Sequence, residues 1–188
     1  MIQVEKKFLP NEEQMQALLQ GADLFTETED HDVYYDFPDY HLSLNGVQFR
    51  LRNGVYGLKI NKNFGNDLGM QADEEIIGYE NIRSYFETED ELASFVQKNM
   101  VEFMNFKTKR KRYKRKYFMI SIDKTDFDYS YVQIETFVEK EEDVKEARES
   151  VISLAKSCGI EIKDMPTKRS FYLKSKNPEL FDKIYNKN

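Results

Sequence analysis

The chain contains little cysteine and histidine, with one cysteine, Cys158, and two histidines among 188 residues. A single cysteine cannot form an intrachain disulfide, and together with two histidines it cannot supply a Cys/His zinc cluster. Any bound metal would need oxygen ligands, which favours magnesium, manganese or calcium. The sequence also lacks an apolar run of about 20 residues and the apolar core of a signal peptide. We therefore expect a soluble, cytoplasmic protein without a membrane partner.

The chain has no excess of basic residues. It contains 28 lysines and arginines and 34 aspartates and glutamates, which gives a formal net charge of -6. This balance argues against a general nucleic-acid binder. Residues 109–116 depart from it, with seven cations in eight positions. Taken alone, such a run is typical of a solvated strand edge or an RNA-facing patch. We expect no nucleic-acid partner, although an RNA-binding domain stays open as an alternative and the run suits an anionic ligand.

Strand patterns dominate the chain, and Asn53-Gly54 between two of them predicts a tight hairpin because both turn positions favour a positive φ. The predicted strands cover residues 2–8, 31–35, 47–52, 55–62, 71–77, 106–118, 119–124, 130–139 and 168–173. The predicted helices cover residues 11–20, 88–99 and 141–158, and a closing helix begins at Asn177-Pro178. No repeat, low-complexity segment or flexible linker interrupts the sequence. We therefore expect one domain, residues 1–188, with a mainly β (α+β) fold.

Side chains alternate between the two faces of a strand, and on several predicted strands one of these faces is mainly charged or polar. The members of this set, in chain order, are Gln3, Glu5, Lys7, Gln48, Arg50, Arg52, Lys59, Glu75, Arg110, Arg112, Lys114, Lys116, Ser121, Asp123, Gln133, Glu135 and Phe137. On any single strand a solvated face is the simpler explanation. Repetition on at least five strands favours a barrel with a polar interior.

A cavity that holds both cations and carboxylates suits one ligand class in particular. Arginine and lysine side chains neutralise a triphosphate, and arginine does so with bidentate geometry. Carboxylates in the same cavity would repel that ligand unless they held a divalent cation bridging to the phosphoryl oxygens. The pattern therefore predicts a site for phosphate and metal together.

These residues resemble the CYTH, or triphosphate tunnel metalloenzyme, superfamily, and within it most closely the thiamine triphosphatase branch. The resemblance begins with the Glu-x-Lys pattern of residues 2–10 and follows the order of the family over nearly the whole chain. Its further motifs are residues 33–39, 49–52, 56–59, Glu75, 108–110, 123–127, 133–135, and Lys168 ahead of 171–173. Each motif is weak alone, and together they are specific.

The resemblance implies a closed eight-stranded antiparallel β-barrel, the triphosphate tunnel, with flanking helices. It implies a metal-dependent hydrolase that removes the terminal phosphate of a small-molecule triphosphate, thiamine triphosphate in this branch, with Mg²⁺ or Mn²⁺ as cofactor. We expect a monomer. The positions that would bind phosphate are Lys7, Arg50, Arg52, Lys59, Arg110, Arg112 and Lys168. The metal positions are Glu5, Glu135, Asp123, Gln3 and Gln133, with Glu75 as a further acidic tunnel position. Lys59 and Tyr34 match a dyad proposed to activate the attacking water.

The sequence departs from the family at the metal positions, because Gln3 and Gln133 stand where glutamates are usual. An amide oxygen can coordinate a hard cation, but it lacks the full charge that offsets dehydration of the ion. Gln48 also replaces a tryptophan of the thiamine branch, and the chain has no tryptophan at all. Two alternatives therefore stay open beside a thiamine triphosphatase: an inorganic triphosphatase, and a catalytically weak triphosphate- or polyphosphate-binding protein.

Overall fold

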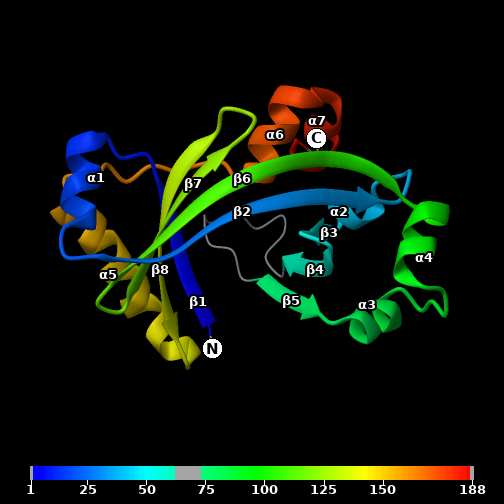
Figure 1. Ribbon diagram of the computed structural model, residues 1–188, viewed down its shortest axis with the longest axis horizontal. Coiled ribbons are helices and arrows are strands. Elements are labelled where there is room, and N and C mark those ends of the chain that lie inside the picture. Colours follow the sequence, from blue (N-terminus) through cyan, green and yellow to red (C-terminus); the bar gives the residue numbers. More distant parts are fainter. Residues whose placement is uncertain (1, 62–72, 187–188) are drawn as a thin grey trace. The chain divides into compact units, whose positions relative to one another are not determined.

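The computed structural model describes residues 2–61 and 73–186, and the chain divides into two compact units. The first unit combines residues 1–29 with 108–166, and the second combines residues 30–107 with 167–188. Two long strands, β2 (Asp23–Asp36) and β6 (Val101–Arg115), contribute residues to both units (Figure 1). The expectation of one domain stays a prediction.

The first unit consists of strands covered by helices on one face. Its remaining strands are β1 (Ile2–Phe8), β7 (Phe118–Thr125) and β8 (Ser130–Val138), and its helices are α1 (Glu12–Leu19), the short 3-10 helix η1 (Glu141–Asp143) and α5 (Val144–Ser157). Phe8 and Ile134 from the strands bury against Leu18 of α1 and Val151 of α5. Asn11 caps α1 by accepting a hydrogen bond from the Gln14 amide, as its position before the helix favours.

The second unit has its own core. Its remaining strands are β3 (Val47–Arg52), β4 (Val55–Asn61) and β5 (Asp73–Ile77), and its helices are α2 (His41–Leu44), α3 (Tyr79–Tyr85), α4 (Leu92–Asn99), α6 (Lys168–Lys176) and α7 (Pro178–Tyr185). Phe49 of β3 and Leu58 of β4 bury against Ile82 of α3 and against Leu92 and Val96 of α4.

The strands follow the order β1-β8-β7-β6-β2-β3-β4-β5 in one sheet. The registers of β1 with β8, β8 with β7, and β7 with β6 are antiparallel, as are those of β2 with β3, β3 with β4, and β4 with β5. A mainly antiparallel fold with flanking helices is therefore confirmed. β1 and β5 stand at the two ends of the order, and within residues 2–61 and 73–186 no pairing joins them, so closure of the barrel is not shown.

The hairpin predicted at Asn53-Gly54 is confirmed. β3 and β4 flank these two residues, whose φ angles of 48° and 83° are both positive. The helix predicted from Asn177-Pro178 is also confirmed, because the Asn177 side chain caps α7 and Pro178 occupies its first turn. Residues 62 and 71–72, the ends of two predicted strands, lie outside the described residues.

The strand predicted over residues 168–173 is wrong, because this segment is helix α6. Thr167 caps the helix by accepting a hydrogen bond of 3.0 Å from the Ser170 amide. Arg169 and Leu173, which are buried, stand four positions apart and so lie on one face of a helix. Local capping and tertiary burial therefore override the alternating pattern that favoured a strand.

Several element boundaries also differ from the sequence prediction. β2 begins at Asp23 rather than at residue 31, and the helix predicted over 88–99 begins at Leu92. β6 ends at Arg115, so Lys116 lies in a turn with a φ of 55° rather than on the ionic face of a strand. Helices α2 and α3 were not predicted. No helix in the described part of the chain combines the length and apolarity needed to cross a bilayer.

Candidate functional site

One strand face of the first unit carries the ionic side chains that alternation predicts. Glu5 of β1 lies opposite Glu135 of β8, and Lys7 lies opposite Gln133. The register continues through β7 into β6 and places Ser121 opposite Arg112. The first ionic face therefore holds Gln3, Glu5, Lys7, Arg110, Arg112, Ser121, Asp123, Tyr131, Gln133 and Glu135.

One strand face of the second unit is built in the same way. Tyr34 of β2 lies opposite Arg50 of β3, and Asp32 lies opposite Arg52. Lys59 of β4 lies opposite Gln48 on one side and Glu75 on the other. The second ionic face therefore holds Asp30, Asp32, Tyr34, Gln48, Arg50, Arg52, Lys59 and Glu75.

Four residues of the first ionic face form an amide–carboxylate cluster, namely Gln3, Glu5, Gln133 and Glu135. Gln3 donates from Nε2 to Oε2 of Glu5 at 2.9 Å and also to Oε2 of Glu135. Gln133 donates from Nε2 to Oε2 of Glu135 at 3.1 Å and also to Oε2 of Glu5. Each amide thus bridges both carboxylates as a hydrogen-bond donor, whereas a metal ligand would present its amide oxygen.

The cluster holds two carboxylates in a confined environment. Glu135 is 5% exposed, and burial raises the pKa of its carboxyl group, as does the charge of Glu5, while Arg112 and the two amide hydrogen bonds oppose the shift. Lys7 places its Nζ 3.7 Å from Oε1 of Glu5. Among the described residues no group of three or more His, Cys, Asp or Glu side chains could hold a metal ion.

Arg110 and Asp123 form a bidentate ion pair on the same face. Nε and Nη2 of Arg110 donate to the two carboxylate oxygens of Asp123, each at 2.6 Å. The Tyr131 hydroxyl also donates to Asp123 Oδ2 at 2.8 Å, and burial followed by the Asp123 charge raises the pKa of Tyr131 strongly. Asp123, predicted as a metal position, therefore orients an arginine with both of its oxygens.

Two buried polar atoms of the first ionic face have no hydrogen-bond partner among residues 2–61 and 73–186. They are Nε of Arg112 and Oγ of Ser121, two residues that lie opposite each other in the register. Buried polar atoms are nearly always hydrogen-bonded, and an exception calls for a ligand or an ordered water. This part of the face therefore offers a donor and a hydroxyl to a bound molecule.

A second bidentate pair lies on the second ionic face. Arg52 donates from Nε and Nη2 to the two oxygens of Asp32 at 2.7 and 2.8 Å, and Asp32 is fully buried. Burial alone would lower the pKa of the Arg52 guanidinium, but the hydrogen bonds and charge of Asp32 raise it overall. Arg50 places its Nη1 3.8 Å from Asp32 and its Nη2 3.4 Å from Glu75. Both arginines predicted to bind phosphate are therefore held by carboxylates.

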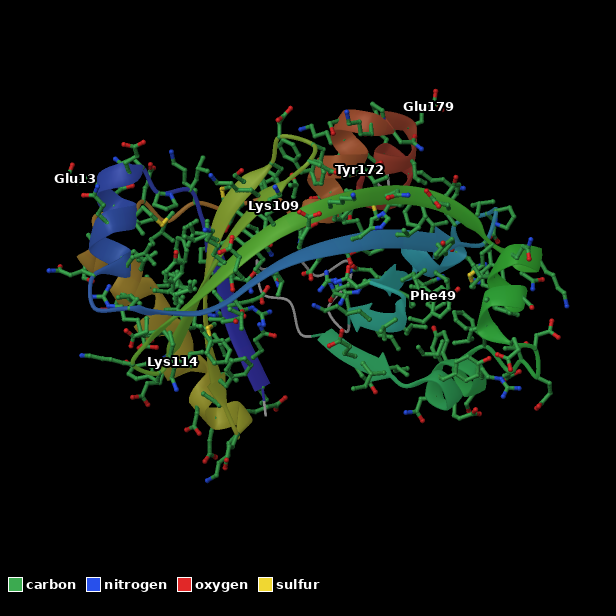
Figure 2. The ribbon with its side chains drawn as sticks, viewed as in Figure 1. Glu13, Phe49, Lys109, Lys114, Tyr172 and Glu179 are labelled. Carbon is green, nitrogen blue, oxygen red and sulfur yellow. The ribbon has the colours of Figure 1, made fainter. Side chains whose placement is uncertain are left out.

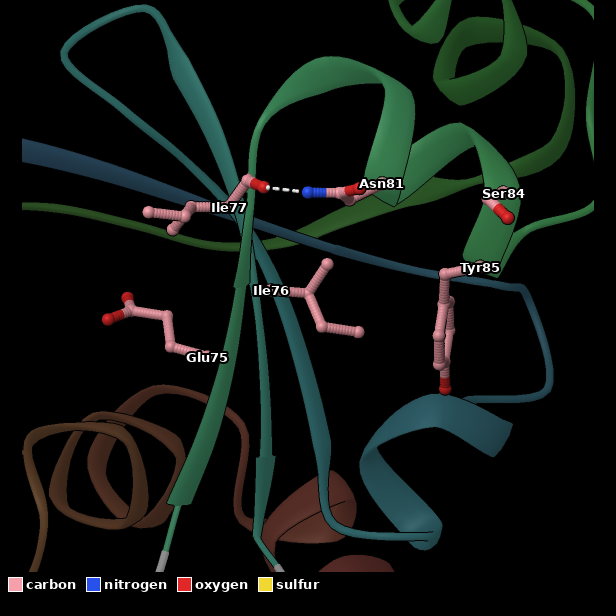
Figure 3. A pocket seen from close by; sticks show the side chains of 6 residues that line it. All are labelled: Glu75, Ile76, Ile77, Asn81, Ser84 and Tyr85. Carbon is pink, nitrogen blue, oxygen red and sulfur yellow. Dashed lines mark hydrogen bonds between the residues drawn. The ribbon is translucent and has the colours of Figure 1, made fainter. Parts of the chain in front are cut away.

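Glu75 also lines an open pocket of about 480 Å³ beside β5 and α3. Figure 3 shows Glu75 and Ile77 pointing to one side of β5 while Ile76 points to the other, toward Tyr85. Asn81 donates to the Ile77 carbonyl at 2.9 Å, and Ser84 completes the wall. The lining contains one carboxylate and no cation, so its chemistry does not suit a triphosphate.

The predicted catalytic pair lies on the second ionic face. Tyr34 is 5% exposed, stacks on Phe106 with ring centroids 5.8 Å apart and meets Phe103 edge-on at 6.5 Å. Lys59 is on β4, so β3 lies between it and the strand of Tyr34. Lys168, expected on a strand, is instead the first residue of α6, with its Nζ 5.9 Å from the Phe106 ring centroid.

The basic run 109–116 does not form a uniform cationic surface. Lys109 and Lys114 both project from β6 (Figure 2). Lys109 and Lys111 are exposed and pair with Glu29 at 3.9 Å and Glu27 at 3.2 Å. Arg115 donates to two carbonyls of α1. The alternation of strand side chains thus divides the run between surface ion pairs and the first ionic face.

Sequence reasoning missed the carboxylates that hold the arginines of the second unit. Asp32 shares its strand face with Tyr34 two positions later, and this parity was the signal that could have found it. Tyr131 likewise shares its face with Gln133. Arg169, which is buried on α6, had no signal because its segment was predicted to be a strand.

Several solved structures share the fold of this chain. The PH1819 protein of Pyrococcus horikoshii OT3 is 20% identical over 93% of this chain and 99% of its own, with a TM-score of 0.68. The PH1012 protein of the same organism is 17% identical over 88% and 94%, with a TM-score of 0.61. HpAC1 of Hippeastrum, reported with a dominant triphosphatase activity, is 17% identical over 93% and 95%, with a TM-score of 0.58. At these identities the likeness shows the fold.

The family follows from a separate comparison that covers most of the chain. Residues 1–167 match the model of the CYTH domain. This range includes the strands of both ionic faces and ends just before α6. The chain therefore belongs to the CYTH domain family.

Proposed function

We propose that the chain is a hydrolase that removes the terminal phosphate of a triphosphate, with thiamine triphosphate as the expected substrate. Membership of the CYTH family and the triphosphatase activity reported for HpAC1 support a triphosphate-related hydrolase. The observation that carries the proposal is the pairing of Arg52 with Asp32 and of Arg110 with Asp123. A guanidinium held at two nitrogens has a fixed plane, which suits bidentate recognition of phosphate.

The ionic faces supply positioning and charge, which are the main requirements of phosphoryl transfer. On the first face Lys7, Arg110 and Arg112 are the proposed phosphate ligands. On the second they are Arg50, Arg52 and Lys59, and Lys168 adds a cation from α6. Lys59 and Tyr34 are the proposed pair that orients and activates the attacking water. A closed barrel, a cytoplasmic location and a monomeric state belong to the same proposal.

A single magnesium ion at the amide–carboxylate cluster is part of the same proposal. Magnesium is often held by one or two protein carboxylates, with substrate phosphates and waters completing its shell. Glu5 and Glu135 lie opposite each other and would hold the ion, while Gln3 and Gln133 would have to turn their oxygens toward it. When bound, the ion would offset negative charge on the phosphoryl oxygens. Manganese has the same ligand preference.

A second candidate function, triphosphate binding with little or no turnover, is favoured by the same cluster. Both amides donate to the carboxylates, so Glu5 and Glu135 each accept hydrogen bonds from two side chains. Metal binding would have to break these hydrogen bonds. An inorganic triphosphate is the alternative substrate, because Gln48 takes the place of the stacking tryptophan of the thiamine branch.

Phosphate release tests the proposed function directly. We expect purified protein with magnesium or manganese to release phosphate from thiamine triphosphate faster than from inorganic triphosphate or ATP. Because the metal is part of the proposal, excess chelator should abolish the release. Faster release from inorganic triphosphate would select that substrate instead. No release from any of the three would reject the hydrolase and leave the binding protein.

A further inference from the structure

Arg169 of α6 is a buried arginine with two unsatisfied guanidinium nitrogens. The residue is 6% exposed, and among the described residues its buried Nε and Nη2 have no hydrogen-bond acceptor. It is not one of the residues that the family resemblance implies.

The aromatic ring beside Arg169 does not satisfy the guanidinium. Its Cζ lies 5.8 Å from the ring centroid of Phe103, within the range of a cation–π interaction. Such a contact stabilises the charge, but it accepts no hydrogen bond in the plane of the guanidinium. A buried charge is retained in proteins when it is both paired and hydrogen-bonded. Within the part of the chain that the structure describes, Arg169 has the Phe103 ring beside it but no carboxylate paired with it.

The surroundings of Arg169 are rich in rings and cations. Phe103 contacts Tyr34 and also Tyr40, the latter with centroids 5.8 Å apart. Lys183 of α7 lies over Tyr40 at 5.3 Å, and Lys168 lies over Phe106, which stacks on Tyr34. Three cations thus contact rings of one connected group that contains Tyr34. Like charges gathered in this way favour an anion.

We propose that Arg169 binds an anionic oxygen of the ligand, namely a phosphoryl oxygen of the triphosphate. This inference rests on the proposed function and adds a binding residue from α6. A guanidinium accommodates phosphate oxygens better than an ammonium does, because its donors lie in a fixed fork. The competing explanation gives Arg169 a packing role on Phe103 alone.

The melting temperature of an Arg169 variant and its affinity for inorganic triphosphate distinguish the two explanations. A binding role predicts a loss of affinity without a loss of stability, and a packing role predicts the opposite. In the unliganded protein we expect Arg169→Met to leave the melting temperature unchanged or raise it, since the change removes an unpartnered buried charge and keeps the apolar volume. We expect the same variant to weaken the binding of inorganic triphosphate, measured by calorimetry, by about tenfold or more. Arg169→Lys should recover part of the affinity because it keeps the charge without the fork.

The matched control is Lys176→Met on the exposed end of the same helix, which should change neither quantity. Arg169→Met with a lower melting temperature and an unchanged dissociation constant would overturn the inference in favour of packing. Absence of inorganic triphosphate binding by the wild-type protein would overturn it as well. If Arg169→Met binds inorganic triphosphate more weakly but the wild type releases no phosphate, the inference about Arg169 stands and the proposed hydrolase fails. If the wild type releases phosphate and Arg169→Met binds inorganic triphosphate as tightly as the wild type does, the proposed hydrolase stands and the inference about Arg169 fails.

Discussion

Replacing Gln3 and Gln133 together by glutamate is expected to make the protein dependent on a divalent cation for its stability and to raise its rate of phosphate release. The amides now donate to Glu5 and Glu135, and glutamates at these positions would turn four hydrogen bonds into repulsion among four carboxylates. Two like charges 4 Å apart repel by about 4 kcal/mol at an effective dielectric constant of 20. We therefore expect a clear fall in melting temperature in the presence of chelator.

Magnesium should reverse this loss, because a ligand present at about 100 times its dissociation constant stabilises the folded state by roughly 2.7 kcal/mol. The rate with magnesium should rise by about tenfold, which corresponds to ~1.4 kcal/mol of transition-state stabilisation. Melting curves and phosphate release, each with and without magnesium, measure both effects. A control that carries the same added charge is Gln16→Glu with Gln97→Glu, two exposed positions on α1 and α4. Equal behaviour of the two double variants would show that the amides do not limit metal binding.

Asp32→Asn is expected to be strongly destabilising. Asp32 is fully buried and accepts both hydrogen bonds of the Arg52 pair, so the change removes the nearer counter-charge of Arg52 and leaves the more distant Asp30, whose Oδ2 lies 3.9 Å from Nη1. Removing one partner of a buried ion pair costs about 3–5 kcal/mol. Urea denaturation should show a loss of this size in the free energy of unfolding, together with weaker inorganic triphosphate binding because Arg52 is no longer held in place.

The control for this variant is Asp164→Asn, which removes the carboxylate of an ion pair with Lys6 whose aspartate is almost fully exposed. Exposed pairs contribute little because solvent screens them. We expect its unfolding curve to match that of the wild type. A loss in Asp32→Asn no larger than in Asp164→Asn would mean that the Arg52 pair does not stabilise the second unit.

Local rules were sufficient to predict much of the fold. Asn53-Gly54 specifies its hairpin through backbone preference, and strand parity placed Glu5 on one strand face with Lys7 and Arg50 on one strand face with Arg52. Both signals depend only on residues near one another in the chain. They were therefore readable before any tertiary contact was known.

The parts that the sequence did not predict depend on partners distant in the chain. α6 forms where an alternating pattern favoured a strand, because Thr167 caps it and Leu173 is buried. The sequence predicted Arg50 and Arg52 as phosphate ligands. Their contacts with Asp32 became visible only in the register of β2 with β3. The amides of Gln3 and Gln133 could be identified as departures from the family, but their use as donors required the packing of β1 against β8.

The central claim is that the ionic faces bind a triphosphate. The most direct measurement is calorimetric titration of inorganic triphosphate into the wild type and three lysine or arginine variants. Lys7→Met alters the first ionic face, Arg50→Met alters the second, and Lys111→Met removes an exposed cation that pairs with Glu27. We predict that Lys7→Met and Arg50→Met each weaken binding by about tenfold or more, while Lys111→Met binds as the wild type does. Wild-type protein that binds no triphosphate, or a Lys7→Met and an Arg50→Met variant that bind it unchanged, would contradict the account.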